Sequence, residues 1–169
     1  KTLEDALKYL DYNKIAGNKA LVKKFRSLYY GKLRFIDDQI RRVVDFCNKK
    51  NIWDNTILIF TSDHGEMLGD HELITKGVKH FDKGIRCPLI VYGSGVKHSV
   101  SDSLVTSLDF FPTFCDMADV PVKPPLEGKS FINQCVGKEE AEKRNEIPVL
   151  YHASENKSVY SLITSDYFR

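Results

Sequence analysis

The chain has 169 residues, 42% of them hydrophobic, so it is long enough to bury a substantial core. Its net charge of +2 argues against a nucleic-acid-binding protein, because such proteins concentrate positive charge to neutralise phosphates. Its four cysteines lack the paired spacing of a zinc site or a disulfide framework.

Two helices are predicted at the start of the chain. Thr2 is a suitable capping residue for a short helix that ends near Leu10. Residues 19–50 have the apolar periodicity of a long amphipathic helix. The basic stretch at residues 23–30 fits the solvated face of this helix better than a binding surface for an anionic polymer.

The segment from Thr56 to Thr61 is the clearest strand in the sequence. Its apolar side chains are continuous rather than alternating, which is typical of a central parallel strand covered on both faces. Leu89 to Tyr92 has the same character. We therefore expect the long helix to pack on a sheet whose central strands include these two segments.

One helix and one strand are predicted in the second half of the chain. Residues Thr106 to Ala118 are helical in pattern, and an extended loop follows from Pro121. The segment from Ser158 to Thr164 reads as a strand near the end of the chain. A strand in that place needs a companion segment outside the chain or leaves an exposed edge.

The tripeptide Asp63-His64-Gly65 directly follows the first strand. Ligands of open α/β sheets collect beyond the carboxyl ends of strands. A carboxylate oxygen and an imidazole nitrogen both bind divalent cations, and a glycine lets the backbone turn tightly beside an ion. By itself the tripeptide is a weak signal, because Asp and Gly are common in turns.

Several motifs in order make the pattern specific. The run from Asn55 to His71, followed by Lys76-Gly77 and by the segment from Gly84 to Gly93, closely resembles the sulfatase family of the alkaline phosphatase superfamily. Segments 29–40, 107–113 and 126–131 extend the resemblance over roughly residues 27–133.

The resemblance implies an α/β fold. We expect a partial alkaline-phosphatase-like sandwich with a mainly parallel central sheet flanked by helices, and the start of a small C-terminal antiparallel subdomain. Residues 1–133 would be the C-terminal part of a sulfatase-like catalytic domain, and residues 134–169 would be a linker and the start of that subdomain.

The nucleophile motif of the family is missing. Similar sulfatases use a formylglycine made from the first residue of a Cys/Ser-x-Pro-x-Arg motif, and in Cys87-Pro88 the proline comes one position too early. The family's first pair of metal-binding Asp residues also lacks a counterpart, and the chain begins at Lys1 without an initiator Met. We therefore expect the native N-terminus, the formylglycine and the remainder of the catalytic domain to lie outside this chain, and the isolated chain to be inactive.

The resemblance implies a metal site at Asp63 and His64. The expected cation is Ca²⁺, with Mn²⁺ and Zn²⁺ as alternatives, because an imidazole ligand is unusual for a hard cation. Glu66 and Asp70 are candidates to hydrogen-bond the ligand imidazole.

Lys76 receives a role from the resemblance, and the two histidines are candidates from the chemistry of imidazole, with an ordinary loop position as the alternative for each. Lys76 would bind the substrate and assist catalysis as a point charge on an ester oxygen or on the nucleophile. His71 is a candidate to protonate the leaving group, since imidazole titrates near neutrality. His80 is a candidate to contact the substrate.

The resemblance thus implies an enzyme that hydrolyses sulfate esters of a small molecule or a glycan. A phosphonate monoester or phosphodiester hydrolase shares the Asp-His-Gly and downstream Lys arrangement, so it stays open as an alternative. A non-catalytic binding module with the same fold also stays open; the missing nucleophile favours it, whereas Asp63, His64 and Lys76 disfavour it. We expect neither a nucleic-acid partner nor a membrane span in this segment. For localisation, the resemblance alone points to a periplasmic or secreted protein.

Overall fold

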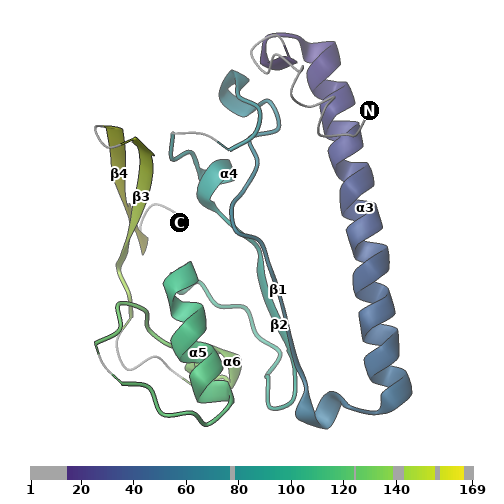
Figure 1. Ribbon diagram of the computed structural model, residues 1–169, viewed down its shortest axis with the longest axis vertical. Coiled ribbons are helices and arrows are strands. Elements are labelled where there is room, and N and C mark those ends of the chain that lie inside the picture. Colours follow the sequence, from purple (N-terminus) through teal and green to yellow (C-terminus); the bar gives the residue numbers. More distant parts are fainter. Residues whose placement is uncertain (1–14, 77–78, 124, 139–142, 155–156, 166–169) are drawn as a thin grey trace. The chain divides into compact units, whose positions relative to one another are not determined.

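The computed structural model describes residues 15–76, 79–123, 125–138, 143–154 and 157–165. The chain divides into two compact units, one formed by Lys1–Trp53 with His64–Pro88 and the other by Asp54–Asp63 with Leu89–Arg169. Helices α3 and α4 belong to the first unit, and strands β1 to β4 belong to the second (Figure 1). The short helix predicted for residues 2–10 lies outside the described residues.

Helix α3 (Lys19–Lys50) confirms the predicted long helix, and local capping explains its limits. The Asn18 side chain accepts hydrogen bonds from the amides of the first turn, those of Ala20 and Leu21, at 3.0 and 3.2 Å. At the other end Asn51 adopts a left-handed conformation with φ 53°, which satisfies the last carbonyls and ends the helix. Two lysines in the last turn complement the helix dipole.

Strands β1 (Ile57–Thr61) and β2 (Leu89–Gly93) form the first sheet (Figure 1). They pair antiparallel, with Ile57 opposite Gly93 and Thr61 opposite Leu89. The expected mainly parallel sheet is therefore not confirmed. An apolar run indicates burial but not direction, and a parallel neighbour needs a long crossover connection that is usually helical. In the described residues between the strands, the connection holds only the single-turn helix α4 (Asp82–Ile85) and a 3-10 turn at Asp70–Glu72.

The burial of this sheet also differs from the prediction. Residues Ile57 to Phe60 of β1 are half-buried, but Ile90 and Tyr92 of β2 are each 58% exposed. Gly93 ends β2 with φ +136°, and a Cβ there would lie 2.1 Å from the Thr56 carbonyl oxygen. Only glycine fits this close approach. The packing of residues 19–50 on the sheet stays a prediction.

The helical segment predicted from Thr106 to Ala118 is confirmed. It consists of a 3-10 turn at Ser107–Asp109 and helix α5 (Phe110–Met117). Thr106 and Asp109 form a reciprocal capping box at its start, which satisfies backbone amides that have no partner within the helix. A second short helix, α6 (Ile132–Cys135), follows the extended loop.

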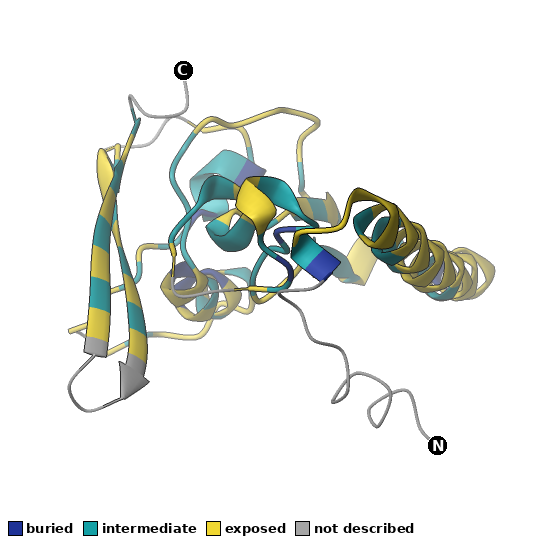
Figure 2. Cartoon of the chain, turned by 90° about the horizontal axis from the view of Figure 1, so that it is seen from above, coloured by how far each residue is buried: buried dark blue, intermediate teal, exposed yellow. Residues whose placement is uncertain are grey.

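Strands β3 (Glu146–Ser154) and β4 (Lys157–Thr164) form a second antiparallel sheet, with Glu146 opposite Thr164. Half-buried and exposed positions alternate from Glu146 to His152 and from Ser158 to Thr164, as the alternating colours in Figure 2 show. Of the two expected outcomes for β4, a companion segment outside the chain or an exposed edge, the first is wrong, because β3 pairs with β4. Strand β3 is not evident from the sequence, because Pro148 lies within it. A proline has no amide hydrogen to donate to a neighbouring strand, so it argues against strand structure.

Each unit has a small buried core. Met67 and Ile74 are buried in the first unit, and Thr113, Phe131 and Cys135 in the second. Within the described ranges, no helix has both the length and the apolar character needed to span a membrane.

Candidate functional site

Asp63 and His64 follow β1 as the sequence predicts. Asp63 is exposed and ends the segment Asp54–Asp63 of one compact unit, while His64 is half-buried and begins the segment His64–Pro88 of the other. The Nδ1 atom of His64 lies 2.7 Å from the Gly65 carbonyl oxygen. Because a carbonyl oxygen only accepts, Nδ1 carries the hydrogen of this bond, and in the neutral ring the lone pair is on Nε2. This is the tautomer in which Nε2 can bind a metal ion.

Gly65 is required by a close backbone approach. Its amide donates to the Gly84 carbonyl oxygen at 2.9 Å, and a Cβ at this position would lie 1.9 Å from the Lys83 carbonyl oxygen. The backbone after His64 is therefore held against α4. A tight turn beside an ion is a general reason for a glycine here, but only the fold identifies the Lys83 backbone as the neighbour that a side chain would clash with.

The loop from Glu66 to Lys76 carries most of the predicted site residues, and two acidic side chains anchor it. Asp70 lies 3.1 Å from Arg26 Nη2 and 2.5 Å from Lys83 Nζ. The hydrogen bond from Lys83, with further attraction from Lys83 and Arg26, outweighs the opposing effect of burial and holds the pKa of Asp70 below its usual value. Arg26 also donates from Nε to the Leu68 carbonyl oxygen at 2.6 Å.

Glu66 is itself a residue of this loop, and its carboxylate accepts hydrogen bonds from other loop residues. Its Oε1 atom accepts hydrogen bonds from the amides of Leu68 and Thr75, at 3.2 and 2.5 Å. Glu66 and Asp70 were expected as candidates to hydrogen-bond a ligand imidazole. Their described partners are instead backbone amides and cationic side chains, so both carboxylates hold the loop in shape.

Lys76, His71 and His80 have different surroundings. Lys76 is exposed and directly follows Thr75. His71 is exposed, with φ 50°, and its ring stacks on Phe81 at a centroid distance of 4.0 Å and an interplanar angle of 8°. His80 is half-buried. The loop thus places His71 against Phe81, the residue next to His80 in the chain. The catalytic and substrate-binding roles of Lys76, His71 and His80 stay predictions.

The donor set partly fits a divalent cation. Asp63 contributes a carboxylate and His64 an imidazole, but Zn²⁺ takes four ligands and Ca²⁺ six to eight. Within the residues that the structure describes, no group of three or more His, Cys, Asp or Glu side chains could hold a metal ion. Further ligands would have to come from water or from other protein segments.

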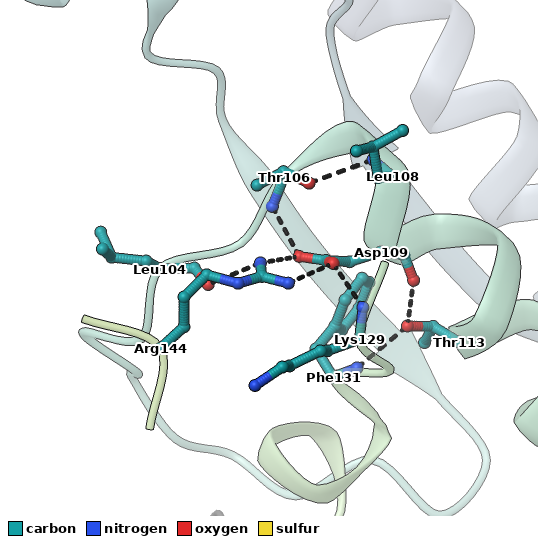
Figure 3. A network of polar contacts seen from close by, with 8 residues as sticks. All are labelled: Leu104, Thr106, Leu108, Asp109, Thr113, Lys129, Phe131 and Arg144. Carbon is teal, nitrogen blue, oxygen red and sulfur yellow. Dashed lines mark hydrogen bonds and ion pairs between the residues drawn. The ribbon is translucent and has the colours of Figure 1, made fainter. Parts of the chain in front are cut away.

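A buried network around Asp109 is the principal polar feature that sequence analysis missed (Figure 3). Asp109 is 1% exposed and accepts hydrogen bonds from the amides of Thr106 and Lys129, both at 2.7 Å. Both terminal nitrogens of Arg144 also donate to its carboxylate, Nη2 at 2.7 Å. Burial raises the pKa of Asp109, but the Arg144 hydrogen bonds and the two amides outweigh it, so the pKa lies below its usual value.

Thr113 extends this network to α6. Its hydroxyl donates to the Asp109 carbonyl oxygen at 2.6 Å and accepts from the Phe131 amide at 3.0 Å (Figure 3). The spacing of Thr106 and Asp109 is a capping-box signal that could have indicated the start of the helix. The role of this network is structural, because its hydrogen bonds join separate segments of the fold to one another.

Comparison with known families gives a match to the sulfatase model over residues 4–120. Among curated relatives, an arylsulfatase of Clostridium perfringens is 34% identical over 127 residues, which cover 71% of this chain and 26% of that protein. The chain spans about a quarter of the length of the curated relatives it matches.

Solved structures show similar folds. A 2-O GAG sulfatase superposes with a TM-score of 0.81 at 21% identity, over 88% of this chain and 34% of that one. The phosphonate monoester hydrolase of Agrobacterium radiobacter superposes with a TM-score of 0.71 at 29% identity, over 80% and 28% of the two chains. A third protein, solved with its substrate D-glucosamine-2-N,6-O-disulfate, gives a TM-score of 0.63 at 28% identity, over 77% and 28%.

Proposed function

The chain belongs to the sulfatase family, and on that premise we propose that it is part of a metal-dependent enzyme that hydrolyses sulfate esters. The observation that carries the proposal is the Asp63-His64-Gly65 turn after β1, followed by a braced loop that ends at Lys76. The attacking group, a formylglycine, is proposed to lie outside the 169 residues.

Asp63 and His64 would hold one divalent cation, Ca²⁺ as the first candidate and Mn²⁺ or Zn²⁺ as alternatives. The hydrogen bond from His64 to the Gly65 carbonyl supports this, because it directs the lone pair of the neutral ring to Nε2. When bound, the cation would offset negative charge on the ester. Remaining ligands would come from outside the chain or from water.

Lys76 would donate hydrogen bonds to a non-bridging oxygen of the ester or to the nucleophile, and its positive charge would offset the negative charge of the reacting anion while the bond to the leaving oxygen breaks and that oxygen takes the electron pair. Its ammonium is a compact charge on a flexible side chain, which suits a contact that strengthens during the reaction. His71 would give a proton to the leaving oxygen, and His80 would contact the alcohol part of the substrate. The stack of His71 on Phe81 restricts the ring and so supports a defined orientation.

We propose a sulfated sugar or another sulfated small molecule as the substrate. The support is the similar protein solved with a disulfated glucosamine, which is 28% identical to this chain. The second candidate activity, phosphonate monoester hydrolysis, is favoured by similarity to two hydrolases of that kind at 27% and 29% identity. Both reactions place a tetrahedral anion beside a cation, so the same side chains could serve either one.

The remainder of the catalytic domain is the proposed partner of this chain. Helix α3 exposes large apolar side chains at heptad-like spacing, with Leu28 62% and Phe35 67% exposed, and Phe46 continues the same face at 55%. Apolar stripes of this kind are usually covered in a folded protein. Their exposure supports a protein in which further segments complete the core.

The test is a kinetic comparison in the longer protein that contains this chain. Hydrolysis of an aryl sulfate and of a phosphonate monoester would be measured for the wild type, His64→Ala and Lys76→Ala. Each substitution should lower kcat/KM by about 100- to 1,000-fold, as expected when one stabilising contact to developing charge is lost. His98→Ala and Lys32→Ala, both at exposed positions, are matched controls that should leave kcat/KM unchanged.

The outcome separates the candidates. A higher kcat/KM for the phosphonate ester favours the second activity, and unchanged kinetics in both site variants would contradict the proposed site. The isolated 169-residue chain should hydrolyse neither ester, because it lacks the nucleophile motif. Turnover by the isolated chain that disappears in His64→Ala would show that the nucleophile lies within it.

A further inference from the structure

The loop before Lys76 has an unusual concentration of left-handed backbone. Leu68, His71, Glu72 and Thr75 all have φ between 50° and 68°. Residues other than glycine rarely adopt these backbone angles, which are least favourable for a β-branched residue such as Thr75. A conformation of this kind persists only when surrounding contacts enforce it.

The contacts on Thr75 include one from the Glu66 side chain, and the Thr75 hydroxyl itself donates to the Lys76 carbonyl oxygen at 3.2 Å. The Glu66 Oε1 atom accepts the Thr75 amide at 2.5 Å across nine residues, and it also accepts the Leu68 amide at 3.2 Å. Met67 adds a longer backbone hydrogen bond from its amide to the Thr75 carbonyl oxygen, at 3.4 Å. One carboxylate oxygen therefore joins the two ends of the loop at its most strained residue.

The middle of the loop is anchored separately. Asp70 binds Arg26 and Lys83, and the Gly69 amide donates to the Leu73 carbonyl oxygen at 2.7 Å. These contacts fix residues 69–73 but do not include Thr75. Glu66 is thus a side chain from the start of the loop that hydrogen-bonds directly to the residue before Lys76.

We propose that Glu66 is a positioning residue for Lys76. Its carboxylate keeps Thr75 in the left-handed conformation and so fixes the direction in which the Lys76 backbone leaves the loop. The inference rests on the proposed function, in which Lys76 contacts the ester. Glu66 itself needs no contact with substrate or metal.

The first experiment measures the brace in the full 169-residue chain, by amide hydrogen exchange at single-residue resolution. Glu66→Ala should accelerate exchange of the Thr75 and Leu68 amides roughly 10- to 100-fold, as expected for the loss of a hydrogen bond to a charged group. Glu66→Gln keeps an acceptor oxygen and should restore most of the protection. The matched control is Glu72→Ala, an exposed acidic residue of the same loop that should leave both amides unchanged. Unchanged amides in α3, which belongs to the same compact unit as the loop, would show that the fold of this unit is intact.

The second experiment is a double-mutant cycle in the longer protein, with an aryl sulfate as substrate. Glu66→Ala should lower kcat by roughly 10-fold or more while changing KM much less, because misplacement of a charge weakens contacts formed in the transition state. In the Lys76→Ala background, Glu66→Ala should lower kcat very little further, because Glu66 acts through Lys76. A general loss of structure would instead add to the effect of Lys76→Ala.

These results separate the two proposals. Additive losses in the cycle, or amide protection that survives Glu66→Ala, would overturn the positioning role even in an active sulfatase. If the wild type hydrolyses neither ester, the proposed function fails, and the positioning role for catalysis fails with it. The exchange data would then still show whether Glu66 braces the loop, so the cause of failure can be identified.

Discussion

Replacing Arg144 with alanine would leave the Asp109 carboxylate buried without its cationic partner. Arg144 donates from both terminal nitrogens to Asp109 and from Nη1 to the Leu104 carbonyl oxygen at 3.3 Å. The Arg144 side chain is 16% exposed and that of Asp109 is 2% exposed, so water can replace the guanidinium only partly.

The expected loss of stability follows from this burial. Removing one member of a buried ion pair costs about 3–5 kcal/mol, because the remaining charge is left uncompensated. Asp109 keeps two backbone amide donors, from Thr106 and Lys129, which favours the lower end at about 3 kcal/mol. Arg144→Lys retains the charge but loses the bidentate hydrogen bond, so it should lower the free energy of unfolding by about 1 kcal/mol.

The assay is urea unfolding of the full chain, followed by circular dichroism. The matched control is Arg41→Ala, whose guanidinium lies 3.5 Å from Asp37 on the exposed surface of α3. An exposed pair of this kind should change the free energy of unfolding by less than about 0.5 kcal/mol. If Arg144→Ala is too unstable to measure, Arg144→Lys still gives the direction and the scale.

A double variant tests the cause. Asp109→Asn with Arg144→Met removes both charges together, so it should cost less than the sum of the two single substitutions by about 1–3 kcal/mol. Strict additivity, or an Arg144→Ala variant as stable as the Arg41→Ala control, would refute the view that the buried pair holds this part of the fold.

Three further results are expected from the same unfolding assay. Gly93→Ala should destabilise the chain by at least about 1–3 kcal/mol, since φ is +136° and the new Cβ would lie 2.1 Å from the Thr56 carbonyl oxygen. Gly31→Ala should stabilise it by about 0.5–1 kcal/mol, because this helical position has nothing within 4 Å of a new Cβ and glycine weakens a helix. Acidification should lower stability, because the pKa values of Asp70 and Asp109 are lower in the folded chain. Their contribution is complete above the ordinary carboxyl pKa of about 3.9 and is lost as the pH falls through the folded values, so stability that stays constant below about pH 4 would contradict this assignment.

Elements whose limits depend on neighbouring residues could be predicted from the sequence. Helix α3 occupies residues 19–50 as expected, because Asn18 and Asn51 cap it locally. The start of the α5 segment at Thr106 follows from a capping box that spans three residues. The order of Asp63, His64 and Lys76 after the first strand was likewise visible, and with it the family.

Contacts between distant residues could not be predicted in this way. The antiparallel direction of β1 and β2 depends on the course of residues 62–88, which an apolar run does not specify. Strand β3 was missed because Pro148 argues against a strand, although pairing with β4 stabilises it. The brace from Glu66 to Thr75 depends on backbone angles that no single residue type signals.

The sequence by itself thus determined the locally capped helices and the family. Only the tertiary structure decided which charges pair, which strands are neighbours and which glycines have no room for a side chain. Arg144 and Asp109 show the reason most clearly: they lie 35 residues apart, and their pairing becomes favourable only when the fold has removed the carboxylate from water.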